Sequence, residues 1–338
     1  MVEEQLRGKN FITCEDWTRE DLDTLLKMAK NLKKMFHAGI PHRFLQDKSI
    51  FNIFFEQSTR TRSSISAGIT QLGGHAHDLA PEMIQLFHGE NAKDTAKVLS
   101  RMGHAIACRN YFYGMGHAYL EDLSRYASIP VFNLQSDLYH PMQGVADLMT
   151  LQETFGESLR GLKVTISWAY SATPPKPLSV PHTQIALFAR YGMNLTVAAP
   201  EEFPLSAAVM RSARDHAAEN EGSVTFVNNM DAAFEDAQVV IPKNWGGFAS
   251  FKIYKDNDEQ RRVMAANLAK HRDWRCTAQR MALAADDARM MHSMPVDRGR
   301  EVDDDVVDGP ASLIYDEAEN RLHTAKALMA LTMGTRGL

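Results

Sequence analysis

The strongest constraint on the fold is a regular alternation of short apolar runs with segments of helical periodicity. Lys48–Phe55 (KSIFNIFF) has the length and apolarity of a buried strand. The next segment places Ile65, Ile69 and Leu72 at i, i+4 and i+7, which predicts one face of a helix, and Gly73–Gly74 ends it. Because strands that alternate with helices pair in parallel, this pattern predicts an α/β fold.

The alternation runs twice along the chain. Strands are expected at HAHDL, HAIACR and PVFNL, and then, after a connecting helix at Val145–Gly156, at KVTISWAY, NLTVAAP, SVTFV and QVVIP. We therefore predict two doubly wound parallel-sheet domains, residues 1–147 and 148–317.

Composition narrows the function classes. The 338 residues suffice for two cores, and the formal charge of −5 argues against a nucleic-acid partner. No apolar run approaches the roughly 20 residues of a membrane helix, and the N-terminal segment lacks the apolar stretch of a signal peptide. The cysteines (Cys14, Cys108 and Cys276) have neither metal nor disulfide spacing, so we expect a cytoplasmic protein without a metal site.

The stretch Ser58–Arg62 (STRTR) places hydroxyls and arginines between the first strand and its helix. Free backbone N–H groups at a helix N-terminus, with the hydroxyls and a planar guanidinium, favour a bound phosphate. The simpler alternative is that Ser58 is an ordinary N-cap and the arginines are solvated. Cations in the first turn oppose the helix dipole, which weakens that alternative.

STRTR resembles the carbamoyl-phosphate signature S-x-R-T-R of the aspartate and ornithine carbamoyltransferases. Four further segments agree with that family in the same order, and together they span nearly the whole chain. They are Gly89–Met102, Arg109 at the end of a strand, Asp137–Gln143 (DLYHPMQ) and His292–Gly299 (HSMPVDRG), which resembles H-C-L-P-x-x-R-G.

The resemblance implies a role for each matching residue. The phosphate would be held by Ser58, Thr59, Arg60 and Thr61. The carbonyl oxygen would be surrounded by Thr61, Arg109 and His140. Gln143 would bond the carbamoyl NH2 group, and Arg298 would close over the site. The carbonyl oxygen gains negative charge when an amine attacks, so donors must already point at it. Phosphate leaves readily and accepts the amine's proton, so no metal or cofactor is expected.

Each of these residues also has a structural alternative. His140 could be a turn histidine, Arg109 a surface ion pair and His292 part of a structural turn; their joint order along the chain favours the site. The resemblance also implies a cis Met294–Pro295 bond. It further implies a homotrimer, in which a loop near Gly89, Glu90 and Lys93 enters a neighbouring subunit's site.

The acceptor amine is left open. The segments WAYSATPPKPLSVP and IPKNWGGF resemble a knotted branch of the family, the N-acetylornithine and N-succinylornithine enzymes, in which a proline-rich loop is threaded by a later segment. A C-terminal helix at 318–338 would pack back on the first domain. Second-substrate candidates are Lys176, Lys243, Trp245, Met294 and Pro295, although Trp245 could be a core residue and Lys176 solvated.

Several departures from that branch fall on the acceptor side. Ser293 replaces a cysteine, Glu301 stands where the acetylornithine enzymes have a lysine, and the proline loop begins with Ser171-Ala172-Thr173. The acceptor is therefore ornithine-like, an N-acylornithine or a shorter diamino acid such as 2,3-diaminopropionate.

Three other interpretations of the sequence are less favoured. A catalytically silent, phosphate-binding or regulatory homologue has no need to keep all the site residues. Another phosphate-using α/β enzyme is disfavoured because the chain has no G-x-x-x-x-G-K-[ST] loop. His75 and His77 could hold a metal ion, but without a third ligand nearby in sequence a plain strand is favoured.

Overall fold

The computed structural model describes residues 5–85, 89–172, 176–246 and 258–334. The chain divides into two compact units, Met1–Met149 with Ala318–Leu338, and Thr150–Glu317. The division falls inside helix α6 (Pro141–Phe155), close to the expected boundary at 147/148.

The first unit is built on a parallel sheet with the strand order β2-β1-β3-β4. Its members match the expected strands: β1 (Ser49–Phe54), β2 (His75–Leu79), β3 (Ala105–Asn110) and β4 (Val131–Ser136). Because all the strands run the same way, their carboxyl ends lie at one edge of the sheet, where ligands of such folds bind.

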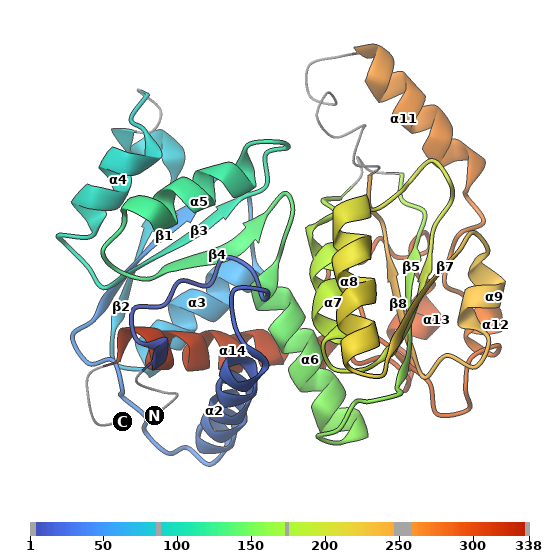
Figure 1. Ribbon diagram of the computed structural model, residues 1–338, viewed down its shortest axis with the longest axis horizontal. Coiled ribbons are helices and arrows are strands. Elements are labelled where there is room, and N and C mark those ends of the chain that lie inside the picture. Colours follow the sequence, from blue (N-terminus) through green and yellow to red (C-terminus); the bar gives the residue numbers. More distant parts are fainter. Residues whose placement is uncertain (1–4, 86–88, 173–175, 247–257, 335–338) are drawn as a thin grey trace. The chain divides into compact units, whose positions relative to one another are not determined.

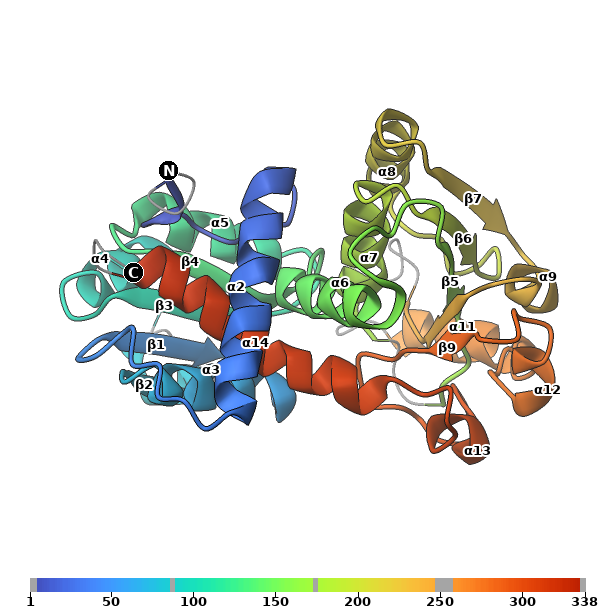
Figure 2. The ribbon, with the colours of Figure 1, turned by 90° about the horizontal axis from the view of Figure 1, so that it is seen from below.

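Helices cover both faces of this sheet (Figures 1 and 2). Helices α4 (Ala92–Leu99) and α5 (Gly116–Tyr126) lie on one face, and α3 (Arg60–Gln71), α2 (Arg19–His37) and α14 (Ile314–Met333) lie on the other. A short 3-10 helix spans Pro81–Met83.

Apolar burial holds α4 and α5 against the strands. The buried cluster joins strand residues to residues of these helices: Ile53, Ile106, Cys108, Val131, Ala92, Ala96, Leu120 and Leu123. On the other face, a Cβ added at Gly68 of α3 would lie 3.0 Å from Met329 and 3.2 Å from Lys326, so α14 packs directly on α3. Each fully buried large side chain contributes about 2 kcal/mol.

The second unit has a parallel sheet with the order β7-β6-β5-β8-β9. Its strands are β5 (Lys163–Trp168), β6 (Asn194–Ala198), β7 (Ser223–Val227), β8 (Val239–Lys243) and β9 (Arg289–Met290). Its helices are α7 (Ser179–Ala189), α8 (Ala207–Glu219), α9 (Met230–Phe234), α11 (Asp258–Lys270), α12 (Ala278–Met281) and α13 (Asp304–Val307). In Figure 1, α7 and α8 lie on one face of this sheet and α9 lies on the other.

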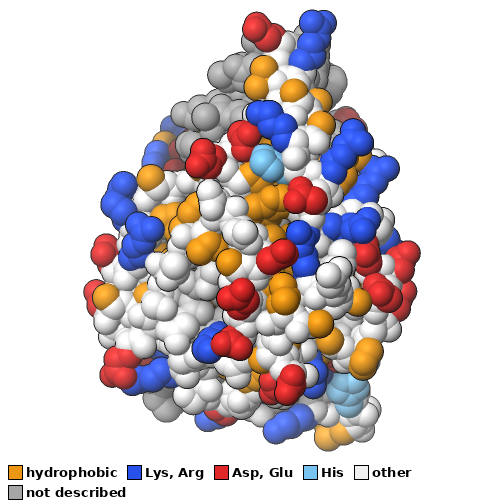
Figure 3. Space-filling model, turned by 90° about the vertical axis from the view of Figure 1, so that its right-hand side faces the viewer, with side chains coloured by type: hydrophobic (Ala, Val, Ile, Leu, Met, Phe, Trp, Pro, Cys, Tyr) orange, Lys and Arg blue, Asp and Glu red, His pale blue; other side chains and the backbone are white. Residues whose placement is uncertain are grey.

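The prediction of two doubly wound parallel sheets is confirmed. The face shown in Figure 3 intersperses acidic and basic side chains, as is usual for a solvated surface. Within the part of the chain that the structure describes, no helix is both long enough and apolar enough to cross a membrane. The predicted knot involves the proline-rich loop, whose residues 173–175 lie outside the described residues, so the knot stays a prediction.

Candidate active site

Three strands of the first sheet end at the edge where the predicted residues lie. Phe54, the last residue of β1, pairs with Arg109 in β3, and the β3–β4 register shifts between Cys108 and Arg109. The loop after β4 carries His140 directly before α6. The strand order therefore gathers segments that are far apart in sequence.

Helix α3 starts one residue later than the N-cap prediction requires. Its first residue is Arg60, and Thr59, with φ −87° and ψ −63°, takes the cap position without a side-chain hydrogen bond. The cap position thus falls on Thr59 and not on Ser58, so the prediction of Ser58 as the N-cap is wrong by one residue. The first turn contains no acidic residue. Arg62 pairs with Asp78 at 3.1 Å.

A buried histidine lies among guanidinium groups at this edge. His140 is 4% exposed. Burial lowers the pKa of His140 well below its ordinary value, and the positive charges of Arg321, Arg109 and Arg60 lower it further. The imidazole is therefore neutral at physiological pH, and it lies within electrostatic reach of all three arginines.

Arg321 is a further member of the candidate site, which the sequence analysis did not single out. It comes from α14 and is buried. One guanidinium nitrogen donates to Thr61 Oγ1 at 2.8 Å, and another donates to Gln143 Oε1. Gln143 Nε2 in turn donates to Asp147 Oδ1 at 2.7 Å. This buried chain fixes the side chains of Thr61 and Gln143, both predicted from sequence.

Arg109, at the same edge of the sheet, has a guanidinium N–H group that can still donate a hydrogen bond. Its guanidinium lies 4.9 Å from the centre of the Tyr111 ring. Burial lowers the pKa of Arg109, an effect that Tyr111 opposes and the charge of Arg60 reinforces. Within the described residues, Arg109 Nε is buried and has no hydrogen-bond partner. An oxygen ligand at this edge would meet an available donor.

The loop that carries His140 is shaped by its own polar residues. Asp137 accepts hydrogen bonds from the backbone N–H groups of Gly114 and His117, each at 2.8 Å, which fastens the loop to the start of α5. Ser136 Oγ accepts from the N–H of Tyr139 at 3.0 Å. Asp137, part of the DLYHPMQ motif, therefore supports the loop that positions His140.

The segment expected to reach a neighbouring subunit is only partly described, because residues 86–88 lie outside the described range. Gly89 has a φ of +89°. Glu90 accepts a hydrogen bond from Thr95 Oγ1 at 3.0 Å, and Lys93 lies 5.5 Å from the centre of the Tyr126 ring. Their role in a subunit contact stays a prediction.

In the second unit, two of the acceptor candidates meet at a buried carboxylate. Glu301 is fully buried, and its carboxylate lies 2.6 Å from Lys176 Nζ and 3.7 Å from Lys243 Nζ. It also accepts the backbone N–H groups of Asn244 at 2.7 Å and Asp297 at 2.8 Å. In the sequence, Glu301 stood out only because the acetylornithine enzymes have a lysine at this position. In the structure, it lies at the centre of this cluster.

The charges of this cluster are nearly balanced. Burial lowers the pKa of Lys243 to about 7, although Glu301 opposes the shift. Burial lowers the pKa of His292 to about 4, so this imidazole, 3.3 Å from Glu301, is neutral at pH 7. Despite its burial, Glu301 has a pKa well below its ordinary value, because Lys243 and its other neighbours favour the carboxylate. Asp297, whose side chain is 21% exposed, adds a second acid 3.7 Å from Lys176.

The remaining second-unit candidates have other partners. Arg298 is exposed and donates to Asp308 at 2.7 Å and Asp304 at 2.8 Å. Trp245 has no exposed surface and donates from its indole to the carbonyl of Phe203 at 3.0 Å, which places it in the core. The Met294–Pro295 bond is cis, which confirms that prediction, and the carbonyl of Pro295 accepts from Lys176 at 3.2 Å.

The fold and the candidate site thus define a two-domain α/β protein with a cluster of cationic side chains at the carboxyl edge of its first sheet. Family models match both parts of the chain. Residues 9–153 match the carbamoyl-phosphate-binding domain of the aspartate/ornithine carbamoyltransferases, and residues 176–332 match the Asp/Orn-binding domain. The chain belongs to the aspartate/ornithine carbamoyltransferase family.

Similar proteins cover the chain almost end to end. The ornithine carbamoyltransferase of Thermococcus kodakarensis is 37% identical over 97% of this chain and 98% of its own length. The solved ornithine carbamoyltransferase of Pyrococcus furiosus is 36% identical, with a TM-score of 0.84 over 97% of this chain and 98% of that one. A solved acetylornithine transcarbamylase in complex with acetylcitrulline is 30% identical, with a TM-score of 0.88 over 97% and 100%.

We predict that Glu301→Gln lowers the free energy of unfolding by about 3–5 kcal/mol, because it leaves the buried Lys243 and the largely buried Lys176 without this carboxylate. Glu221→Gln is the matched control, since Glu221 pairs with Arg160 at a side chain that is 73% exposed; we expect a change within about 0.5 kcal/mol. Urea unfolding at pH 7 measures both. Equal decreases in the free energy of unfolding of the two variants would show that the buried Glu301 cluster stabilises the protein no more than an exposed ion pair does.

Proposed function

We propose that this protein transfers the carbamoyl group of carbamoyl phosphate to the amine of an amino acid, giving a ureido product and phosphate. The observation that supports this most directly is the convergence of Arg60, Arg109 and Arg321 around neutral His140. Like charges repel, so a group of guanidiniums at a strand edge suits a multiply charged anion.

The phosphate would bind at the start of α3. Ser58, Thr59 and Thr61 supply hydroxyls there, and the helix N-terminus supplies backbone N–H groups and a partial positive charge. Arg60, in the first helical turn, adds a planar pair of donors that matches phosphate oxygens. The absence of acidic residues from that turn leaves its positive potential uncompensated by the helix itself.

The carbonyl oxygen would be polarised by donors from three elements: Arg109 of β3, His140 before α6 and Arg321 of α14. The amine lone pair attacks the carbonyl carbon, the carbon–oxygen bond to phosphate then breaks, and phosphate takes the electron pair and the amine's proton. Because His140 is neutral, it acts here as a hydrogen-bond donor. Losing one such donor typically costs roughly 3–4 kcal/mol of barrier.

Gln143 would orient the carbamoyl NH2 group. Its Oε1 already accepts from Arg321, and an amide oxygen has a second lone pair for the ligand N–H. Asp147 holds the amide nitrogen, so the side chain cannot flip without losing both hydrogen bonds. Arg321 and Asp147 therefore set the direction in which Gln143 Oε1 points.

For the acceptor we propose a diamino acid with a free α-amino group, ornithine or a shorter homologue. The second-unit cluster places both signs together, Lys176 and Lys243 beside Glu301 and Asp297, which suits a zwitterionic amino-acid head. An N-acylated acceptor keeps the carboxylate but has a neutral amide in place of the α-ammonium charge. The 37% identity to a protein named ornithine carbamoyltransferase agrees with this choice.

The other second-unit candidates have weaker support. Met294 and Pro295 belong to the loop whose carbonyl holds Lys176, whereas Trp245 is a core residue and can affect the acceptor only indirectly. Arg298 would have to leave Asp304 and Asp308 to close over a ligand. A silent homologue is not favoured, and the knot, the homotrimer and the cytoplasmic location remain predictions.

Arg60→Ala tests the phosphate site, with Arg62→Ala as its matched control in the same helical turn. Arg62 pairs with Asp78 and its guanidinium lies 4.4 Å from the centre of the Phe54 ring. We predict that Arg60→Ala weakens carbamoyl-phosphate binding by at least about a hundredfold, the loss of one charge-assisted bidentate contact, and that Arg62→Ala changes it by less than about fivefold. Calorimetry measures both; undiminished binding by the Arg60 variant would contradict the assignment.

A panel of acceptors tests the substrate class. The purified protein is incubated with carbamoyl phosphate and ornithine, 2,4-diaminobutyrate, 2,3-diaminopropionate or their Nα-acetyl forms, and the ureido product is assayed. We predict that kcat/KM is higher for the free diamino acid than for its acetylated form in every pair. Preference for acetylated acceptors would refute the zwitterion argument, and no product from any amine would refute the enzyme activity itself.

A further inference from the structure

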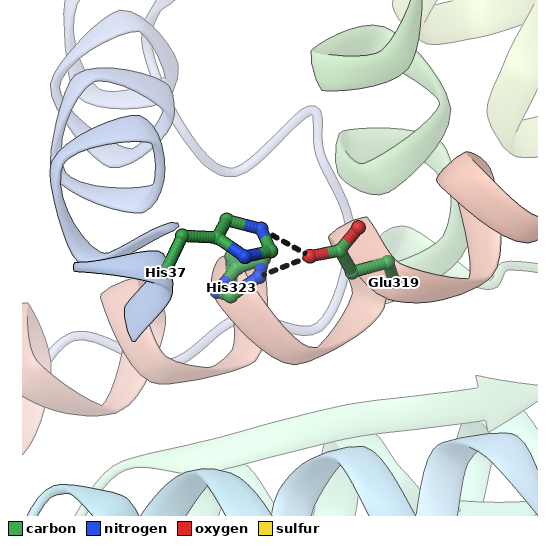
Figure 4. Close-up of side chains that lie close together, drawn as sticks. All are labelled: His37, Glu319 and His323. Carbon is green, nitrogen blue, oxygen red and sulfur yellow. Dashed lines mark hydrogen bonds and ion pairs between the residues drawn. The ribbon is translucent and has the colours of Figure 1, made fainter. Parts of the chain in front are cut away.

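A second group of polar side chains lies in the first unit, where the last turn of α2 meets α14. His37 is the last residue of α2, and Glu319 and His323 lie one turn apart on α14. Figure 4 shows both imidazoles directed at one carboxylate. His37 Nε2 lies 2.8 Å and His323 Nε2 lies 3.2 Å from the same oxygen, Glu319 Oε1.

We propose that His37, Glu319 and His323 form a binding site for a divalent transition-metal ion of the Zn²⁺ class. One potential ligand atom from each residue lies within 4.8 Å of the others. Two imidazole nitrogens and a carboxylate oxygen are a donor set that Zn²⁺ takes, with bonds of about 2.0–2.2 Å. Neighbouring donors in a tetrahedral site then lie about 3.3–3.5 Å apart, so the two contacts between an imidazole nitrogen and Glu319 Oε1 need only open slightly.

Burial differs across the three ligands in a way that suits entry of an ion. The His323 side chain is fully buried, Glu319 is 33% exposed and His37 is 58% exposed. The buried imidazole gives the site a fixed anchor on α14. The exposed side leaves room for a water molecule as the fourth ligand, as in sites that are not closed by protein.

Nearby cations limit the affinity. Lys33 Nζ lies 3.9 Å from Glu319 Oε2, the oxygen that faces away from the histidines, and also donates to Asn320 at 2.8 Å. Lys326 is held by His42 at 3.1 Å and Gln71 at 3.0 Å. Since both positive charges oppose a divalent ion, we expect a dissociation constant of roughly micromolar order and not the far tighter binding of structural zinc.

A bound metal ion would link α2 to the turn of α14 that contributes Arg321 to the proposed active site. Arg321 is two residues from both Glu319 and His323, so it points to the opposite face of the helix, where it reaches Thr61 and Gln143. An ion between α2 and α14 would fasten the turn that carries Arg321. Binding to the folded state alone also raises the unfolding temperature by linkage.

His75 and His77 are the natural rival and provide the control. Both are exposed on β2, with ring centres 4.6 Å apart. Among the described residues, only the His37 group brings three potential ligands together. A pair of surface histidines offers one ligand fewer and no buried anchor.

The experiment titrates Co²⁺ into chelator-treated full-length protein, follows the visible absorption that tetrahedral Co²⁺ gives, and then displaces Co²⁺ with Zn²⁺. The variants are His37→Ala, Glu319→Gln and the double control His75→Ala/His77→Ala. We expect one ion per chain in the wild type, binding weaker by at least about tenfold in each of the first two variants, and unchanged binding in the control. Each altered side chain is at least partly exposed, so the variants should fold, which circular dichroism checks.

Two results would overturn the proposal. One is the lack of tetrahedral Co²⁺ absorption at concentrations well above micromolar in the wild type. The other is binding that persists in His37→Ala and disappears in the His75/His77 control. Since the titration uses neither carbamoyl phosphate nor an acceptor, its outcome is independent of the proposed enzyme activity.

Discussion

The first unit depends on holding like charges close together. Arg60, Arg109 and Arg321 all act on His140, and their mutual repulsion has to be offset by the rest of the unit. The parallel sheet fixes the position of Arg109, and α14 carries Arg321 into hydrogen bonds with Thr61 and Gln143. The potential that makes this arrangement costly in the free protein is what would attract a doubly charged phosphate and polarise its carbonyl group.

In the second unit, by contrast, positive and negative charges balance around Glu301. Two lysines share one buried carboxylate, and His292 beside them stays neutral because burial lowers its pKa to about 4. A compensated cluster attracts anions weakly but can order an amino-acid head that carries both signs. The two units thus differ in electrostatics in the way that their proposed ligands, a dianion and a zwitterion, differ.

Local sequence pattern was sufficient to predict the strands and part of the candidate site. Periodicity located the strands, and motifs at strand ends located Arg60, Arg109 and His140. Arg321 was missed because it lies 260 residues from Thr61 and because the amphipathic pattern of its helix marks only the apolar side. The N-cap position of α3 and the burial of Trp245 could not be predicted from the sequence either, because backbone angles and tertiary packing determine them. Glu301 could be noticed as unusual, but only the fold shows that both lysines reach it.

The protonation state of His140 decides whether the three arginines act on this residue. It is measured by ¹⁵N NMR of histidine-labelled protein, and the His140→Gln variant assigns the resonance. We expect the imidazole to stay neutral through the pH range in which an ordinary histidine titrates, both alone and with carbamoyl phosphate, while ligand binding shifts its resonance. A His140 that titrates near the ordinary histidine value of 6.5 and ignores the ligand would show that the arginines do not converge on it.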